Sequence, residues 1–155
     1  MASSEKKRNS INRSSEFNHV IDTLVGRGGE KVFKAMYELI CFAAYVGVNN
    51  NKRLKIKPNF KEEPIDLQLF ITNSLDRHIW TINLFANGDV AKFLDHNSCI
   101  ETFEEFANGG MHIISQRLSE SATDIKGVET LMTMIQKVNA AEKKQSKKQN
   151  RKITF

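Results

Sequence analysis

The sequence predicts an all-α (mainly α) fold, a single compact bundle of five to seven helices with one short edge strand or hairpin near Leu54 to Lys57. Apolar residues recur at steps of three and four in several segments, and polar or glycine-rich turns separate these segments. At 155 residues and 40% hydrophobic, the chain is long enough for one domain with its own core. We expect the helical domain to span residues 11–139, with a disordered basic N-terminus at 1–10 and a disordered basic C-terminal tail at 140–155.

No apolar run approaches the length of a membrane-spanning helix, and the first ten residues lack the apolar stretch of a secretory signal. We therefore expect a cytoplasmic protein with no membrane contact. Its two cysteines, Cys41 and Cys99, do not form a disulfide framework. We expect both to be reduced thiols, with Cys41 packed in the core.

The first two helices are expected on either side of a glycine-rich turn. Ser14 or Ser15 can cap a short helix over Phe17 to Val25, which the turn GRGG ends. This turn lacks the preceding strand and the Gly-Lys-Ser/Thr ending of a nucleotide-binding loop. The second helix, Lys31 to Val46, is apolar on nearly every side and should be the most buried, with Gly47 as its C-terminal cap.

Further helices are expected beyond the polar segment that follows Gly47. They span 64–71, 75–85, 90–94 and 125–138. Pro64 suits the first turn of one of them, and Asn87-Gly88 ends another.

The helix from Ser98 to Leu118 should be central, because its apolar residues keep to one face for about five turns. Ser98 and Glu101 form a capping-box pattern at its start. Gly109 and Gly110 interrupt it, and a helical glycine costs about 1 kcal/mol relative to alanine. One interpretation ends the helix at Gly109 and starts another just beyond. We favour a continuous helix, because the apolar spacing is preserved across the pair and another backbone can approach closely there.

The net charge of +5 is distributed unevenly along the chain. Residues 1–13 carry +3 and residues 137–155 carry +6, so the middle, residues 14–136, carries −4. Cations therefore gather in two places that could follow a DNA backbone. One set is Lys52, Arg53, Lys55 and Lys57, near Lys61, and the other is Lys143, Lys144, Lys147, Lys148, Arg151 and Lys152. The alternative for the first set is a solvated edge strand or loop whose lysines only keep it soluble.

None of the polar clusters has the spacing of a catalytic or metal site. A possible acid/base set, Glu101, Glu104 and Glu105, is better explained as a solvated acidic face near a helix N-terminus. A possible cation site, Asp89, Asp95, His96 and Asn97, consists of residues that suit caps and turns. We therefore expect no enzyme activity, no metal and no cofactor.

Several sequence blocks resemble one known family. They are FAAYVGV, NNNKR, EEPIDLQLF, INLFANGDVAKFL and, most specifically, FEEFANGG. This last block consists of Phe103, Glu104, Glu105, Phe106, Ala107, Asn108, Gly109 and Gly110. The pattern resembles the DNA phosphorothioation-associated protein 4 family over about Ile11 to Leu118, and the basic tail lies outside it. Phe106 stands where the family usually has Tyr, and Met111 where it has Leu.

The resemblance implies an antiphage or DNA-modification setting. Members of this family are small proteins that accompany bacterial systems in which sulfur replaces a backbone phosphate oxygen of DNA and unmarked DNA is restricted. The leading hypothesis is a non-enzymatic accessory subunit that binds a larger ATPase or nuclease and, non-specifically, the DNA backbone. A protein adaptor or oligomeric scaffold with no DNA contact is the alternative, and a nuclease or hydrolase is the third hypothesis. The oligomeric state stays open at this point.

Overall fold

The computed structural model describes residues 5–88, 91 and 94–152, with side chains as far as Gln149. Of the described residues, 67% are helical, which confirms the predicted class. Six α-helices are present in the described part of the chain: α1 (Asn18–Leu24), α2 (Met36–Asn49), α3 (Leu67–Thr72), α4 (Asp76–Asn87), α6 (His96–Glu120) and α7 (Val128–Lys152). Two short 3₁₀ turns, η1 (Ser15–Phe17) and η2 (Pro58–Phe60), accompany two-residue strands, β1 (Ser10–Ile11) and β2 (Ile65–Asp66).

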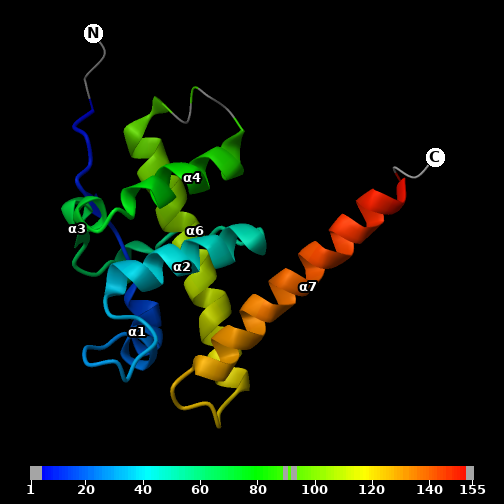
Figure 1. Cartoon of the computed structure of the whole chain (residues 1–155). Helices are drawn as coiled ribbons and strands as arrows, with labels where there is room; N and C mark the ends of the chain where they lie inside the picture. Colours follow the sequence, from blue (N-terminus) through cyan, green and yellow to red (C-terminus); the bar gives the residue numbers. More distant parts are fainter. Residues whose placement is uncertain (1–4, 89–90, 92–93, 153–155) are drawn as a thin grey trace.

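Helix α6 is the centre of the fold, as the sequence predicts. It packs against α2, α4 and α1, and α2 crosses it (Figure 1). Its side chains Ile100, Phe103 and Ile114 are fully buried, and Phe70 of α3 meets Phe103 edge to face at 6.0 Å. Helix α6 therefore supplies the apolar layer that the shorter helices cover.

Two glycines, Gly47 of α2 and Gly110 of α6, form the crossing of the two helices. A Cβ atom on Gly110 would lie 2.5 Å from the carbonyl carbon of Ala43, and one on Gly47 would lie 2.9 Å from that of Phe106. The helix runs unbroken through Gly109 and Gly110, so the predicted continuous helix and close backbone approach are confirmed. The prediction that Gly47 caps α2 is wrong, because Gly47 is buried inside the helix.

The predicted strand near Leu54 to Lys57 is not present, and these residues are extended without a ladder partner. The small sheet lies elsewhere: β1 and β2 pair antiparallel, with Ser10 opposite Asp66. Asp66 also accepts a hydrogen bond from the backbone N–H of Gln68 at 2.8 Å and so caps α3, which begins at Leu67, three residues later than Pro64. Asp95, rather than Ser98, caps α6.

Both ends of the described chain carry more structure than the sequence suggested. Ser10 belongs to β1, and α7 continues as a helix to Lys152 through the segment expected to be disordered. The expected short helix over 90–94 falls largely outside the described residues, as does Asp89. Among the helices that the structure describes, none has the length and apolar character needed to cross a membrane.

Candidate nucleic-acid interface

A basic strip, residues 52–61, begins against α6, includes the turn η2 and carries five cations and no anion. The backbone N–H of Leu54 donates to the carbonyl of Glu105 at 3.0 Å. The side-chain amide of Asn108 donates to the carbonyls of Leu54 and Lys55, at 3.2 and 3.4 Å. Gly109 leaves room for the backbone of Lys52, whose carbonyl carbon would lie 2.7 Å from a Cβ atom there. One turn of α6 thus fixes the start of the strip.

Two of the four predicted DNA-binding cations of the strip already have acidic partners within the protein. Arg53 forms an ion pair with Glu105, and its guanidinium lies over the ring of Phe106 at 5.4 Å from the centroid. Lys57 pairs with Glu16 at 3.1 Å, although its side chain is 65% exposed. Arg53 is therefore mainly a packing residue, whereas Lys57 remains open to solvent.

The three other cations of the strip are Lys52, Lys55 and Lys61. Lys55 and Lys61 are exposed, and Lys52 is half-buried. None of the ion pairs within the described residues involves these three lysines. Together with Lys57 they place four positive charges on residues 52–61, on both sides of the turn η2, which is suited to phosphate contact.

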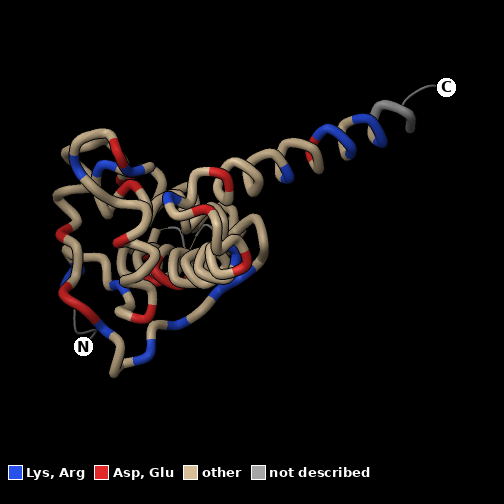
Figure 2. The backbone as a smooth tube through the Cα atoms, turned by 90° about the horizontal axis from the view of Figure 1, so that it is seen from below, with Lys and Arg blue, Asp and Glu red and all other residues tan. Residues whose placement is uncertain are grey.

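The second predicted set lies on α7. Lys143, Lys144, Lys147 and Lys148 are exposed, and their spacing places all four on one side of the helix. Arg151 and Lys152 continue the same pattern in the helical backbone, but their side chains lie outside the described part. Figure 2 shows the cations of α7 along the portion of the helix that stands clear of the body. The two predicted sets of cations thus lie on different parts of the molecule. One is on the basic strip that α6 holds, and the other is on the projecting half of α7.

The acidic pair of the FEEFANGG motif (residues 103–110) is buried, so its interpretation as a solvated face is wrong. Glu104 and Glu105 are each 7% exposed, and only Glu101 of the three carboxylates faces solvent. Burial raises the pKa of Glu104, while hydrogen bonds from Arg8 and from the backbone N–H of Asn12 act in the opposite direction. Arg8 also forms an ion pair with Glu104.

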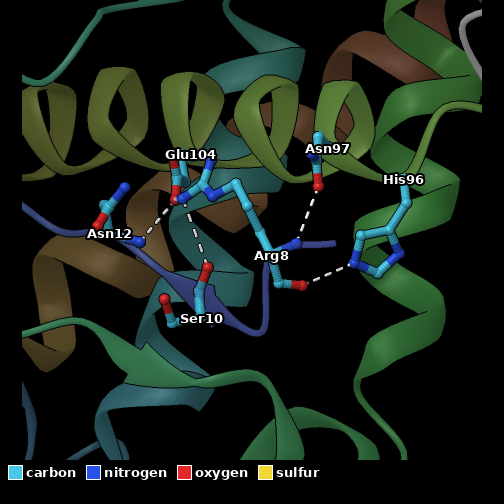
Figure 3. Close-up of polar contacts among 6 residues, drawn as sticks. All are labelled: Arg8, Ser10, Asn12, His96, Asn97 and Glu104. Carbon is cyan, nitrogen blue, oxygen red and sulfur yellow. Dashed lines mark hydrogen bonds and ion pairs between the residues drawn. The ribbon is translucent and has the colours of Figure 1, made fainter. Parts of the chain in front are cut away.

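Figure 3 shows how Glu104 helps to hold an N-terminal arm, residues 5–13, against α6. Asn97 accepts a hydrogen bond from the backbone N–H of Arg8 at 2.9 Å, and His96 Nε2 lies 2.8 Å from the Arg8 carbonyl oxygen. The backbone N–H of Asn12 donates to Glu104 at 2.6 Å. The residues of the possible cation-binding site at 89–97 therefore have structural roles where they are described. Asp95 caps α6, and His96 and Asn97 hold the arm.

Sequence reasoning missed this arm and the partners of the strip. Arg8 and Glu104 are 96 residues apart, and Arg53 and Glu105 are 52 apart, so no local pattern links them. The available signal was the unusual composition of the motif, in which two glutamates sit between two phenylalanines that the core requires. Carboxylates in an apolar helix face are normally paired when they are buried.

Comparisons with known proteins place the chain in a family. The family described as DNA sulphur modification system-associated protein 4 matches residues 10–153, so the match includes α7 and extends beyond the Leu118 limit of the resemblance. Neither the curated proteins nor the solved structures contain a match. Because the match covers nearly the whole sequence, this chain belongs to the DNA sulphur modification system-associated protein 4 family.

Proposed function

We propose that this chain is a non-enzymatic accessory subunit of a bacterial DNA-modification-linked defence system. It contacts the DNA backbone without sequence preference and binds a larger ATPase or nuclease of the same system. Its family is associated with DNA sulphur modification, which supports the setting. The single observation that carries the DNA contact is the row of exposed lysines on one side of α7.

The geometry of α7 favours phosphate contact over base reading. A helix with long, flexible cations on one side can lie along a duplex and neutralise several phosphates. Lysine acts as a point charge and does not distinguish one singly charged phosphate group from another. Duplexes with and without backbone sulfur should therefore bind with similar affinity, and recognition of the mark would fall to the partner protein.

A non-enzymatic role is supported by the use of the carboxylates. Glu104 and Glu105 pair with Arg8 and Arg53, and Asp95 caps a helix. These groups hold the fold together, and their partners are arginine side chains and backbone N–H groups. The chemistry of the system is therefore assigned to the partner.

The DNA contact is tested by fluorescence anisotropy with a labelled duplex and the full chain. We expect weak binding that falls steeply with salt. Replacing Lys143, Lys144, Lys147 and Lys148 with Ala should lower affinity about tenfold or more and reduce the salt slope by about 0.9 for each phosphate contact removed. The matched control, Gln145→Ala with Gln149→Ala, shortens neighbouring side chains on the same helix without changing charge.

Two outcomes would overturn the DNA contact: no binding by the full chain at low salt, or unchanged affinity in the four-lysine variant. The first outcome would favour the adaptor hypothesis. The protein partner is tested separately, by pull-down of the tagged chain from cells that contain the complete system, followed by mass spectrometry. Recovery of an ATPase or nuclease of that system is expected, and recovery of none would remove this half of the proposal.

A further inference from the structure

Helix α7 carries an apolar stripe that the rest of the chain covers only at its start. Leu131 is buried in the core, but Ile135 is 42% exposed, and Met134 and Val138 are half-buried. These four residues follow one another at steps of three, one and three, so they share one side of the helix. Beyond them, every described side chain from Asn139 to Gln149 is exposed.

This stripe forms one wall of a groove of about 770 Å³. The opposite wall comes from α2 and α6 and includes Phe42, Tyr45, Val46 and Ile113. Phe85, at the end of α4, also lines the groove and is 71% exposed. Figure 1 shows α7 leaving the body at an angle, with its C-terminal half projecting away from the other helices. The groove therefore has a mainly apolar lining, to which Arg117, Lys137 and Glu142 add charge.

We propose that the α7 helix of a second copy of this chain occupies the groove, in an antiparallel dimer with two-fold symmetry. An amphipathic helix is the ligand that an apolar groove between helices accepts. Helix α7 itself has this character, because its stripe of Met134, Ile135 and Val138 lies on the side away from most of its lysines. Two-fold symmetry lets each copy fill the groove of the other with the same surface.

The charges along α7 determine the orientation. The four described lysines 143, 144, 147 and 148 lie in its second half, whereas residues 120–129 carry three carboxylates, Glu120, Asp124 and Glu129, against Lys126. A parallel pair would align the two lysine rows within about one Debye length, ~8–10 Å. An antiparallel pair centred between Ile135 and Val138 separates the rows and brings each toward the carboxylates of the other copy.

The stability of α7 as a helix also supports a partner packed along its second half. In one copy every described side chain from Asn139 to Gln149 is exposed, and isolated helical segments of about 12–15 residues are marginal in water. Packing along a partner helix supplies tertiary contacts beyond Leu131 and extends burial along the stripe. The proposal does not depend on DNA binding, so it stands or fails separately from the proposed function.

The first test is the molar mass of the full chain by light scattering over a range of concentrations. The wild type should approach twice the 17.7 kDa of one chain, and Ile135→Glu should stay at one chain. The matched control, Gln136→Glu, places the same charge one residue away on an exposed site outside the groove and should still dimerise. A monomeric wild type at every concentration, or equal effects of the two substitutions, would overturn the proposal.

The second test measures orientation with a spin label on Ser146→Cys. Ser146 lies eight to eleven residues beyond the proposed centre, so antiparallel helices place the two labels about 25–35 Å apart. A parallel pair would bring them within about 20 Å, because neighbouring helix axes lie about 8–10 Å apart. A short distance in a dimer would contradict the antiparallel arrangement, even if the mass agreed.

Discussion

Gly110 of α6 and Ala43 of α2 lie in backbone contact, so closely that a Cβ atom on Gly110 would come 2.5 Å from the carbonyl carbon of Ala43 and 3.0 Å from its Cα. Rigid backbone, not a flexible side chain, occupies the space. The two helices can therefore approach this closely only while residue 110 has no side chain.

Gly110→Ala should destabilise the fold despite the better helix propensity of alanine. Propensity alone would favour the variant by about 1 kcal/mol. Separating α2 from α6 costs more, and we expect a net loss of about 1–3 kcal/mol in the free energy of unfolding. Urea denaturation followed by circular dichroism measures it. Gln116→Ala, an exposed change on the same helix, should stay within about 0.5 kcal/mol. A Gly110→Ala variant as stable as wild type would show that the crossing can widen without cost.

Arg8→Ala should destabilise the protein in a pH-dependent way. Burial sets the pKa of Glu104 above its ordinary value of 4.5, so the folded protein loses stability as the pH rises from 4.5 through the folded-state pKa. Arg8 stabilises only the ionised carboxylate. Its removal should therefore raise the folded-state pKa of Glu104 further, so the loss should be largest, about 3 kcal/mol, above that raised pKa and smallest below the wild-type folded-state pKa.

The measurement is the unfolding free energy of wild type and Arg8→Ala at several pH values between mildly acidic and neutral. Arg13→Ala is the control, because Arg13 pairs with the more exposed Glu62 at 3.7 Å. That variant should lose about 1 kcal/mol or less at every pH. An Arg8→Ala loss that does not change with pH would mean that Glu104 is not the group that Arg8 stabilises.

Asn108→Ala should loosen the basic strip while leaving the core intact. The substitution removes two hydrogen bonds to the carbonyls of Leu54 and Lys55, at a cost of about 1–2 kcal/mol. Hydrogen exchange should become faster at the amide of Leu54, which bonds to Glu105, and unchanged in the middle of α6. Asn73→Ala also removes a side-chain to backbone bond, 2.7 Å to Leu69, but should not affect the strip. Unchanged exchange at Leu54 in the Asn108 variant would show that the strip does not need the amide.

Cys41 should be chemically inert in the folded protein. Burial, with a smaller contribution from Glu38, raises the pKa of this thiol to about 12. At pH 8 only about one thiol in ten thousand would be ionised, and the thiolate is the reactive form. Burial also raises the pKa of Cys99. A thiol reagent such as DTNB should modify neither residue until denaturant is added, whereas Gln116→Cys should give one fast-reacting thiol. Rapid modification of the native wild type would contradict this expectation.

The sequence predicts best those features that depend only on residues within one helix. The spacing of Ile100, Phe103 and Ile114 predicts α6 across its glycine pair, because those side chains need one shared face. Asn87-Gly88 predicts the end of α4, and Gly88 does adopt the left-handed conformation there. Local chemistry was sufficient for both features.

Elements that depend on distant partners could not be read in the same way. Gly47 looks like a helix cap in sequence, and only the approach of Phe106 from α6 explains a glycine inside α2. The second half of α7 was expected to be disordered because it has no apolar stripe. Its many Lys, Gln and Ala residues are nevertheless good helix formers, and their propensity favours a helix over disorder.

The candidate site was predictable in composition but not in arrangement. The sequence identifies the lysines of the strip and of α7, but it does not show that Arg53 is held by Glu105 or that the strip is fastened to α6. Those facts depend on pairs 50 or more residues apart in the chain. They are tertiary contacts that a single sequence does not encode at any fixed spacing.

The clamp on the N-terminal arm also sets an order of events during synthesis on the ribosome. Arg8 leaves the ribosome long before Glu104, His96 and Asn97, the residues that hold it. The N-terminal arm therefore lacks its final contacts until residues 96–104 have been synthesised. The N-terminal arm can therefore reach its place only after α6 has been made.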